Sequence, residues 1–188
     1  MSKQHLASTD QAIVAQVRGG DSAAYAQLMQ RYEHKLMRYV MYQVKDAALA
    51  ADIVQETFIK AYENLWSYKP AYAFSTWLYR IAHNQMVSAL RKQHHVVPNS
   101  EAFLADLAYE PKIAEAIDQS FTKTNVQHCL HDLDQKYRDV LQLVYFEDMS
   151  YSQVADVLRV PAATVGVWVA RGKSKLRAIC ERKGTHHA

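Results

Sequence analysis

The sequence predicts an all-α protein of two small helical domains joined by a linker, the C-terminal one with a helix-turn-helix. The 188 residues include only five glycines and four prolines, which favours helix over sheet. Apolar residues recur at three- and four-residue spacing along most of the chain, as in amphipathic helices. Between residues 93 and 123 this periodicity weakens, acidic residues outnumber basic ones and two prolines occur, which indicates a linker.

The first two helices are expected before residue 45. Asp10 is a candidate N-cap for a helix that ends at Arg18, because two glycines follow. Asp21 or Ser22 can cap a longer helix that reaches about Val44. Its apolar stripe is typical of core packing and consists of Tyr25, Leu28, Met29, Tyr32, Leu36, Tyr39 and Val40.

A third helix is expected from about Ala47 to Leu65. On one side, three- and four-residue spacing predicts a buried apolar stripe made of Ile53, Phe58, Ile59 and Tyr62. The opposite side is polar and acidic, and carries Asp52, Gln55 and Glu56. This arrangement leaves an acidic face free for a partner, although such a face is often merely solvated.

An aromatic-rich loop and a fourth helix follow. The chain must turn near Pro70, which cannot lie comfortably inside a helix, and the next helix starts at Ser75 or Thr76. Aromatic rings close to lysine and arginine suit stacking on unpaired bases. The rings concerned are Trp66, Tyr68, Tyr72, Phe74, Trp77 and Tyr79, of which Trp77 is expected to be core. The outward side chains of the fourth helix are expected to be Arg80, His83, Asn84, Ser88, Arg91 and Lys92.

A second helical module is expected from Asn125 onward. Ser150 and Gln153 have the spacing of a capping box, and a turn ending at Pro161 leads into a last helix. Two helices joined in this way indicate a helix-turn-helix, whose second helix enters the major groove of DNA. The last helix is strongly basic, which favours phosphate contact. Its inward residues are expected to be Val165, Val169 and Leu176.

Three motifs resemble one known family. D-x-x-Q-E-x-F from Asp52 and F-S-T-W-L-Y-R-I-A-x-N from Phe74 resemble the core segment of sigma-70 family transcription initiation factors, in their small two-domain extracytoplasmic-function branch. Y-x-Q-V-A-x-x-L-x-V-P-x-x-T-V from Tyr151 resembles the promoter minus-thirty-five reader of the same family. The resemblance covers about residues 10–92 and 125–177.

The resemblance implies a sigma factor that directs bacterial RNA polymerase core to specific promoters and initiates transcription by binding and opening promoter DNA. It implies an N-terminal sigma domain at 1–92, an acidic linker at 93–123 that threads toward the polymerase cleft, and a C-terminal helix-turn-helix domain at 124–188. Polymerase core docking is implied at Asp52, Gln55, Glu56 and Phe58. Minus-ten recognition is implied at Lys60, Asn64, Trp66, Ser67, Tyr68, Tyr72, Arg80, Asn84, Arg91 and Lys92. Minus-thirty-five recognition is implied at Thr164, Val167, Trp168, Arg171, Lys173 and Lys175.

The last helix departs from the family pattern. Relatives commonly have a basic residue, a serine and an arginine where this chain has Gly166, Val167 and Trp168. Hydrogen-bond donors are therefore missing from the positions nearest the bases, and upstream recognition is expected to be weak or unusual. Trp168 is equally compatible with an exposed and a buried position.

The family also implies an anti-sigma factor that covers both domains. No cofactor, metal or catalytic residue is expected, because the cluster of His128, Cys129 and His131 lacks a fourth ligand. Cys129 and Cys180 are expected to be reduced thiols. No apolar run approaches the roughly 20 residues of a membrane span, and no signal peptide follows Met1, so a cytoplasmic protein without membrane insertion is expected.

Two other classes of function are compatible with part of the sequence. A stand-alone DNA-binding repressor or activator could use the helix-turn-helix without polymerase, and would bind duplex DNA tightly by itself. A metal-dependent hydrolase could use scattered His and Asp residues. The hydrolase would need ligand spacing, a phosphate-binding loop or a nucleophile with a placed base, which this sequence lacks.

Overall fold

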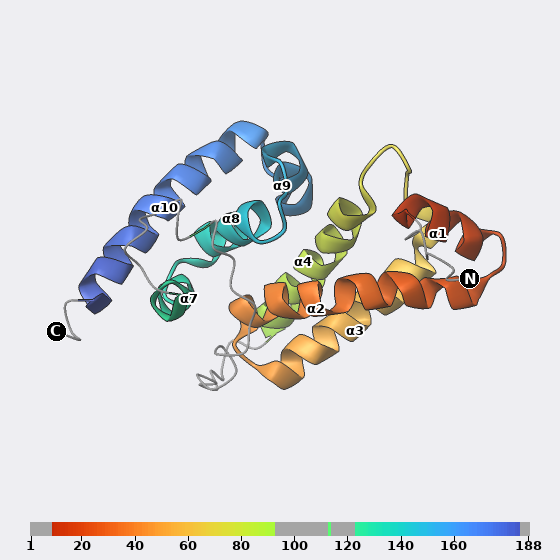
Figure 1. Ribbon diagram of the computed structural model, residues 1–188, viewed down its shortest axis with the longest axis horizontal. Helices are drawn as coiled ribbons and strands as arrows, with labels where there is room; N and C mark the ends of the chain where they lie inside the picture. The colour runs from red at the N-terminus through yellow and green to blue at the C-terminus, as the bar shows by residue number, and fades with distance from the viewer. Residues whose placement is uncertain (1–8, 93–112, 114–122, 185–188) are drawn as a thin grey trace, which may run out of the picture.

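The computed structural model describes residues 9–92, 113 and 123–184, which contain helices and turns but no strand, as the sequence predicts. Figure 1 shows two groups of helices side by side. The first group consists of α1 (Asp10–Arg18), the 3-10 turn η1 (Ser22–Ala24), α2 (Tyr25–Val44), α3 (Ala47–Glu63), the 3-10 turn η2 (Leu65–Ser67) and α4 (Phe74–Lys92). The second consists of α7 (Lys123–His131), α8 (Gln135–Tyr145), α9 (Tyr151–Leu158) and α10 (Ala162–Gly184).

The first group is organised around α2, α3 and α4, which pack on one another in pairs. On α3 the buried residues are Ala50, Ile53, Val54, Thr57, Phe58 and Ala61. Two residues of the predicted stripe, Ile59 and Tyr62, are each 45% exposed, so that part of the prediction is wrong. The buried face of α3 instead includes three small residues, Ala50, Thr57 and Ala61. Small side chains allow α3 to lie close to its neighbours.

The helix ends agree with local chemistry. Thr9, and not Asp10, is the N-cap of α1, since its hydroxyl oxygen accepts the Ala12 N–H at 3.3 Å. Asp46 caps α3 by accepting the Leu49 N–H at 3.0 Å. Gly20 has a φ of 103°, a conformation that glycine adopts without strain, so it allows the tight turn between α1 and η1.

The second group contains the predicted helix-turn-helix. The capping box of Ser150 and Gln153 is present, and Arg159 adopts a left-handed conformation with a φ of 56° in the turn that follows α9. Val165, Val169 and Leu176 of α10 are buried, as expected. Gly172 is buried where α10 crosses α8, and an added Cβ would lie 3.3 Å from Leu141 and Tyr137. The glycine therefore allows α10 and α8 to lie closer together here than a larger residue would without a shift of Leu141 or Tyr137.

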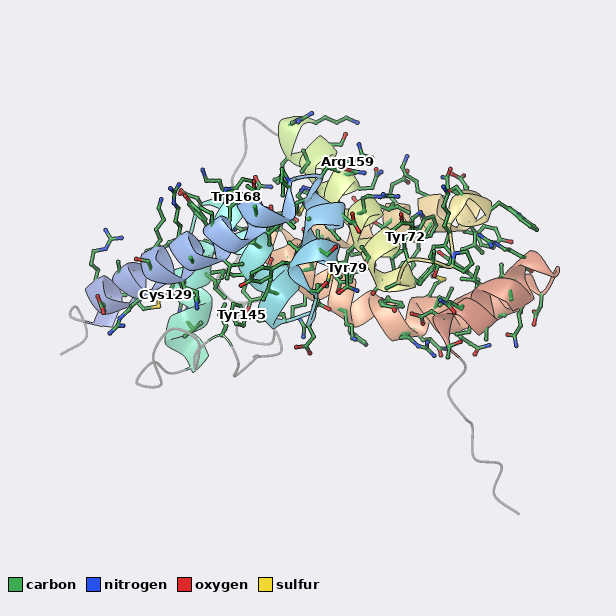
Figure 2. The ribbon with its side chains drawn as sticks, turned by 90° about the horizontal axis from the view of Figure 1, so that it is seen from above. Tyr72, Tyr79, Cys129, Tyr145, Arg159 and Trp168 are labelled. Carbon is green, nitrogen blue, oxygen red and sulfur yellow. A yellow bond between two sulfur atoms is a disulfide. The ribbon has the colours of Figure 1, made fainter. Side chains whose placement is uncertain are left out.

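A disulfide joins Cys129 in α7 to Cys180 in α10, with a Cα–Cα distance of 5.4 Å (Figure 2). The expectation of two reduced thiols is therefore wrong. The two cysteines are 51 residues apart in sequence, and sequence spacing alone does not reveal that α10 turns back along α7. Both side chains are buried.

The two groups of helices also pack on each other through polar contacts. The Gln43 side-chain amide in α2 donates to the Gln142 side-chain oxygen in α8 at 2.8 Å. Arg38 donates to the Glu147 carboxylate at 2.5 Å, and the Glu147 side chain is only 4% exposed. Residues that the sequence assigns to separate domains are therefore in direct contact.

Most of the predicted linker, 93–123, lies outside the described residues. Ile113 is buried, and Lys123 opens α7. Within the described part of the chain, no helix combines the length and the apolar character needed to cross a bilayer.

Candidate nucleic-acid interface

The segment between α3 and α4, residues 64–73, contains the predicted aromatic loop and is closed by short-range hydrogen bonds. After α3 ends, the Asn64 side-chain amide donates to the Lys60 carbonyl at 2.8 Å, and the Ser67 hydroxyl donates to the Asn64 carbonyl at 2.8 Å. Two rings then project into solvent, because Trp66 is 74% exposed and Tyr72 is 56% exposed. Large exposed rings on an ordered turn are available for stacking on a partner.

Tyr68 differs from the two exposed rings and requires a correction. It is 2% exposed and packs against Phe74 and Trp77, with ring centres 5.4 and 5.5 Å away. Its hydroxyl donates to the Tyr72 carbonyl at 2.8 Å, and burial raises the pKa of the phenol. Tyr68 therefore shapes the loop from inside and presents no open face for base stacking. Trp77 is buried, as expected.

A cavity of about 270 Å³ opens between the loop and the start of α4. Cationic, hydroxyl and aromatic groups line it, which is the combination that binds a polar planar group by stacking and hydrogen bonding. One residue with a carboxylate, Asp156 of α9, also lines it. The lining residues are Ser67, Tyr68, Lys69, Tyr72, Thr76, Trp77, Arg80 and Asp156.

Helix α9 lies beside the polar face of α4 (Figure 1). Arg80 and Asn84 line a second cavity, of about 240 Å³, together with Arg159 from the turn after α9. Arg91 lines a third with Val157 and Leu158. Asn84, Arg91 and Lys92 are exposed, whereas Arg80 and Lys60 are half-buried. The predicted minus-ten residues of α4 therefore share their face with the helix-turn-helix.

His83 of α4 does not point freely outward as predicted. Its Nδ1 lies 3.0 Å from the Tyr39 hydroxyl of α2, and burial lowers the pKa of the imidazole to about 4. The ring is therefore neutral at pH 7. It belongs to the contact between the two groups of helices.

The predicted docking face of α3 is in the open. Asp52, Gln55 and Glu56 are all exposed, and Glu56 forms an ion pair of 3.1 Å with Lys60 one turn later. Phe58 is 4% exposed and packs in the core, as the predicted apolar stripe requires, so its implied part in docking needs correction. It can support the face from beneath but cannot contact a partner directly.

The predicted minus-thirty-five residues of α10 fall into two sets. Val167 is 47% exposed and Arg171 and Lys175 are also exposed, while Thr164 and Lys173 are half-buried. Lys175 donates to the Asp134 carboxylate at 2.8 Å. Trp168 is half-buried and lines a cavity of about 410 Å³ between α10, α8 and α4, so it faces the first group of helices.

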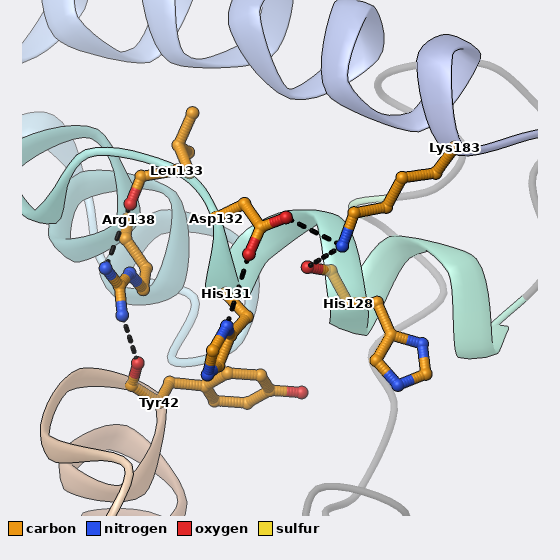
Figure 3. A network of polar contacts seen from close by, with 7 residues as sticks. All are labelled: Tyr42, His128, His131, Asp132, Leu133, Arg138 and Lys183. Atoms are coloured by element: carbon orange, nitrogen blue, oxygen red, sulfur yellow. Dashed lines mark hydrogen bonds and ion pairs between the residues drawn. The ribbon is translucent and has the colours of Figure 1, made fainter. Parts of the chain in front are cut away.

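Sequence reasoning missed a buried arginine that joins the two groups of helices (Figure 3). Arg138 of α8 donates to the Tyr42 carbonyl of α2 at 2.5 Å and to the Leu133 carbonyl at 2.9 Å. Nearby, Lys183 near the end of α10 lies 2.7 Å from the Asp132 carboxylate. The Arg138–Tyr42 and Lys183–Asp132 contacts depend on tertiary packing, and no local pattern in the sequence indicates them.

The described residues contain no group of three or more His, Cys, Asp and Glu side chains that could hold a metal ion. Cys129 is joined to Cys180, so its thiolate is not available as a ligand.

Comparisons with known proteins agree with these features. Residues 28–96 match the family description Sigma-70 region 2, and residues 123–176 match Sigma-70, region 4. The chain is 31% identical to the RNA polymerase sigma-H factor of Pseudomonas aeruginosa, over 89% of this chain and 91% of that protein. It is 32% identical to the ECF RNA polymerase sigma-E factor of Haemophilus influenzae, over 89% and 93%.

Solved structures give the same fold. CnrH, in complex with the cytosolic domain of CnrY, superposes with a TM-score of 0.71 at 25% identity, over 92% of this chain and 97% of that one. The sigma factor RpoE of Bartonella quintana, in complex with the anti-sigma factor NepR, superposes with a TM-score of 0.65 at 19% identity, over 84% and 96%.

Proposed function

The chain belongs to the extracytoplasmic-function branch of the sigma-70 family, and on that premise we propose how its residues divide the work of transcription initiation. As a sigma factor it directs RNA polymerase to specific promoters and initiates transcription there. We assign three tasks, one to each of three surfaces: polymerase docking, capture of the opened minus-ten strand, and contact with the upstream element.

Docking on polymerase core is assigned to the exposed face of α3, with Asp52, Gln55 and Glu56 as its contacts. The three side chains are on one side of an ordered helix and are open to solvent. Phe58 holds this helix on the core behind the face. Asp52 and Glu56 are not held in a buried contact. A basic or amide-rich partner surface can therefore bind them at little desolvation cost.

Capture of the minus-ten strand is assigned to the aromatic loop and the adjacent face of α4. The observation that carries the proposal is that two rings of one loop, Trp66 and Tyr72, are exposed, and that Tyr72 also lines a cavity of about 270 Å³. An unpaired base can stack on such a ring whatever its sequence, and polar groups of the cavity can then hydrogen-bond to its edge. The cations available for the phosphates are Lys60, Lys69, Arg80, Arg91 and Lys92.

Upstream contact is assigned to α10, the second helix of the helix-turn-helix. Arg171 and Lys175 are exposed and can bind phosphate oxygens. Val167 is also exposed, but its side chain can make only apolar contacts. Affinity there would come mainly from charge, and base discrimination from the minus-ten surface.

Strand capture requires the two groups of helices to separate. Helix α9 lies beside the face of α4 that carries Arg80 and Asn84, and Asp156 of α9 lines the loop cavity. A negatively charged DNA strand cannot occupy this face together with that helix. The separation would break the contacts of Arg38, Gln43 and Arg138 with the other group.

Regulation and location complete the proposal. The protein would occur in the cytoplasm, where polymerase works, and would catalyse no reaction itself. We divide the chain into an N-terminal sigma domain at 1–92, a linker at 93–123 and a helix-turn-helix domain at 124–188. An anti-sigma factor is proposed as a further partner, because RpoE, which shares the fold, was solved with the anti-sigma factor NepR. Such a partner would bind both groups of helices and prevent polymerase docking.

The experiment that tests the proposal is reconstitution with core polymerase. The protein should form a stable complex with core polymerase and support transcription from a subset of a promoter library. The isolated protein should bind duplex DNA weakly. Tight duplex binding without any polymerase complex would instead favour a stand-alone DNA-binding regulator.

A further inference from the structure

Helix α1 contacts the aromatic loop from behind, through its last residue. Arg18 is half-buried, and its Nη2 donates to two loop carbonyls, of Leu65 at 2.6 Å and of Tyr68 at 2.5 Å. These carbonyls lie at the two ends of the short turn η2. The Leu65 carbonyl also accepts the turn's own bond from the Tyr68 N–H at 3.2 Å, so Arg18 adds a second donor to this carbonyl and joins it to the Tyr68 carbonyl beyond the turn.

The same guanidinium also contacts the rings. Its carbon lies 5.6 Å from the ring centre of Trp66 and 5.9 Å from that of Tyr68, both within the range of a cation–π contact. Tyr68 is buried, whereas Trp66 keeps 74% of its surface exposed. One side chain therefore fixes the backbone on both sides of Trp66 and touches the ring, and still leaves most of that ring open.

A second contact from α1 supports the loop further along. The Gln11 side-chain amide donates to the Pro70 carbonyl at 2.9 Å. Helix α1 is itself fixed on α2, because the Asp10 carboxylate bonds to both Arg31 and Tyr32. The loop is thus attached to α2 through α1, and not only through its own ends.

We propose that Arg18 is a positioning residue for promoter opening, which holds the turn of Trp66 in the conformation that receives an unpaired base. This inference rests on the proposed role of the aromatic loop. Arg18 does not touch the DNA strand in this role. An arginine is required because its Nη2 donates to both carbonyls while the planar guanidinium lies within cation–π distance of the rings, whereas a lysine ammonium has no planar face to place against them.

The test uses holoenzyme reconstituted with core polymerase and carrying Arg18→Ala or Arg18→Lys. Both variants should open a duplex promoter less well, by about 5-fold to 100-fold in permanganate reactivity, the equivalent of one lost base stack. Transcription from a promoter with a pre-opened bubble should be reduced much less, and affinity for core polymerase should be unchanged. If Arg18→Ala does not fold, Arg18→Lys, which keeps the charge, carries the test.

Arg31→Ala is the matched control. It also removes one cation that attaches α1, but the Tyr32 hydroxyl still bonds to Asp10 and keeps α1 on α2, and the contacts of the loop itself are unchanged. Equal opening defects in Arg31→Ala and Arg18→Ala would reduce Arg18 to a general packing role, and normal opening by both Arg18 variants would overturn the proposal outright. If opening fails in Trp66→Ala but not in the Arg18 variants, the loop reads DNA without Arg18. If Trp66→Ala and Tyr72→Ala also open the promoter normally, the proposed function of the loop is itself wrong.

Discussion

The Tyr39 hydroxyl of α2 lies 3.3 Å from a carboxylate oxygen of Asp139 in α8, across the contact between the two groups of helices. Burial raises the pKa of Asp139 to about 7, although Arg138 opposes the shift. The same hydroxyl lies 3.0 Å from the Nδ1 of His83. A protonated Asp139 can donate to Tyr39 while Tyr39 donates to the neutral imidazole, so one proton completes a chain of three groups.

Asp139→Asn should change how stability depends on pH. An unfolded aspartate has a pKa of about 3.9, so the stabilisation from the buried carboxyl is complete below about pH 4 and is lost as the pH rises to about 7. The Asp139→Asn variant has no carboxyl group to ionise at this position, so it does not lose this stabilisation as the pH rises. Its free energy of unfolding should therefore rise relative to wild type between pH 4 and 7, by up to about 1.4 kcal/mol per pH unit, and the difference should then stay constant.

Denaturant unfolding at several pH values measures this difference. The lowered pKa of His83 gives the opposite slope between about pH 4 and 6.5, so only the comparison of the two proteins isolates Asp139. Asp156→Asn, at an exposed carboxyl, is the control. A difference that does not vary with pH would place Asp139 in the ionised form throughout.

Asp52→Ala combined with Glu56→Ala should weaken binding to core polymerase and leave the fold intact. The two acids are exposed, and the Glu56–Lys60 pair contributes within about 1 kcal/mol to stability. Competition for core polymerase against a labelled sigma factor measures the affinity. Glu63→Ala, at the exposed end of the same helix, should compete normally. A double variant that also competes normally would contradict the docking assignment.

Trp66→Ala and Tyr72→Ala should each reduce holoenzyme binding to a single-stranded minus-ten oligonucleotide by about 1 to 3 kcal/mol, because each removes an exposed stacking face. Fluorescence anisotropy measures the binding. Tyr151→Ala removes a ring that is 45% exposed but lies on α9, outside the loop, and serves as the control. Equal losses in all three variants would mean that ring exposure, and not the loop, determines binding.

Gly166→Lys should sharpen discrimination of the upstream element. A Cβ at Gly166 would lie 3.6 Å from the Tyr151 ring, an ordinary contact, so the helix accepts the side chain. A basic donor near the bases adds about 1 to 3 kcal/mol of preference for a matching guanine. A promoter library with a randomised upstream element measures it. Wild-type protein that already discriminates by this amount would show that α10 uses other contacts.

Reduction of the disulfide should destabilise the second group of helices. For a closed loop of 51 residues the chain-entropy estimate is about 4 kcal/mol, less any strain that reduction releases. Thermal unfolding with and without a phosphine reductant measures the effect. The double variant Cys129→Ala and Cys180→Ala should not respond to the reductant. Two free thiols in the denatured, unreduced protein would show that the bond does not form.

The sequence predicted the helices well, because caps, prolines and apolar spacing act within a few residues. The capping box at Ser150 is such a case. The prediction of burial was wrong where burial depends on which helix lies opposite. Phe58 and Ile59 are neighbours on α3, and both were expected to be buried, yet Phe58 is 4% exposed and Ile59 is 45% exposed. Tyr68 could not be distinguished from Trp66 for the same reason, since both are rings in one loop.

The contact between the two groups of helices could not be predicted at all. His83, Asp139 and Trp168 are informative only when α8 and α10 are placed against α2 and α4, and no local pattern reports that placement. Arg18 is a similar case, because its bonds to Leu65 and Tyr68 join residues about 50 positions apart. The motifs therefore indicated candidate surfaces, whereas tertiary packing determined which side chains are open on them.

The disulfide has a mechanical consequence. Cys129 lies in α7, the first helix of the second group, and Cys180 lies near the C-terminal end of α10. Tension applied to the chain ahead of α7 would reach α10 through a covalent bond. The disulfide therefore prevents a pulling force from detaching α7 from α10 beyond Cys129. The force acts instead on α10 as a whole.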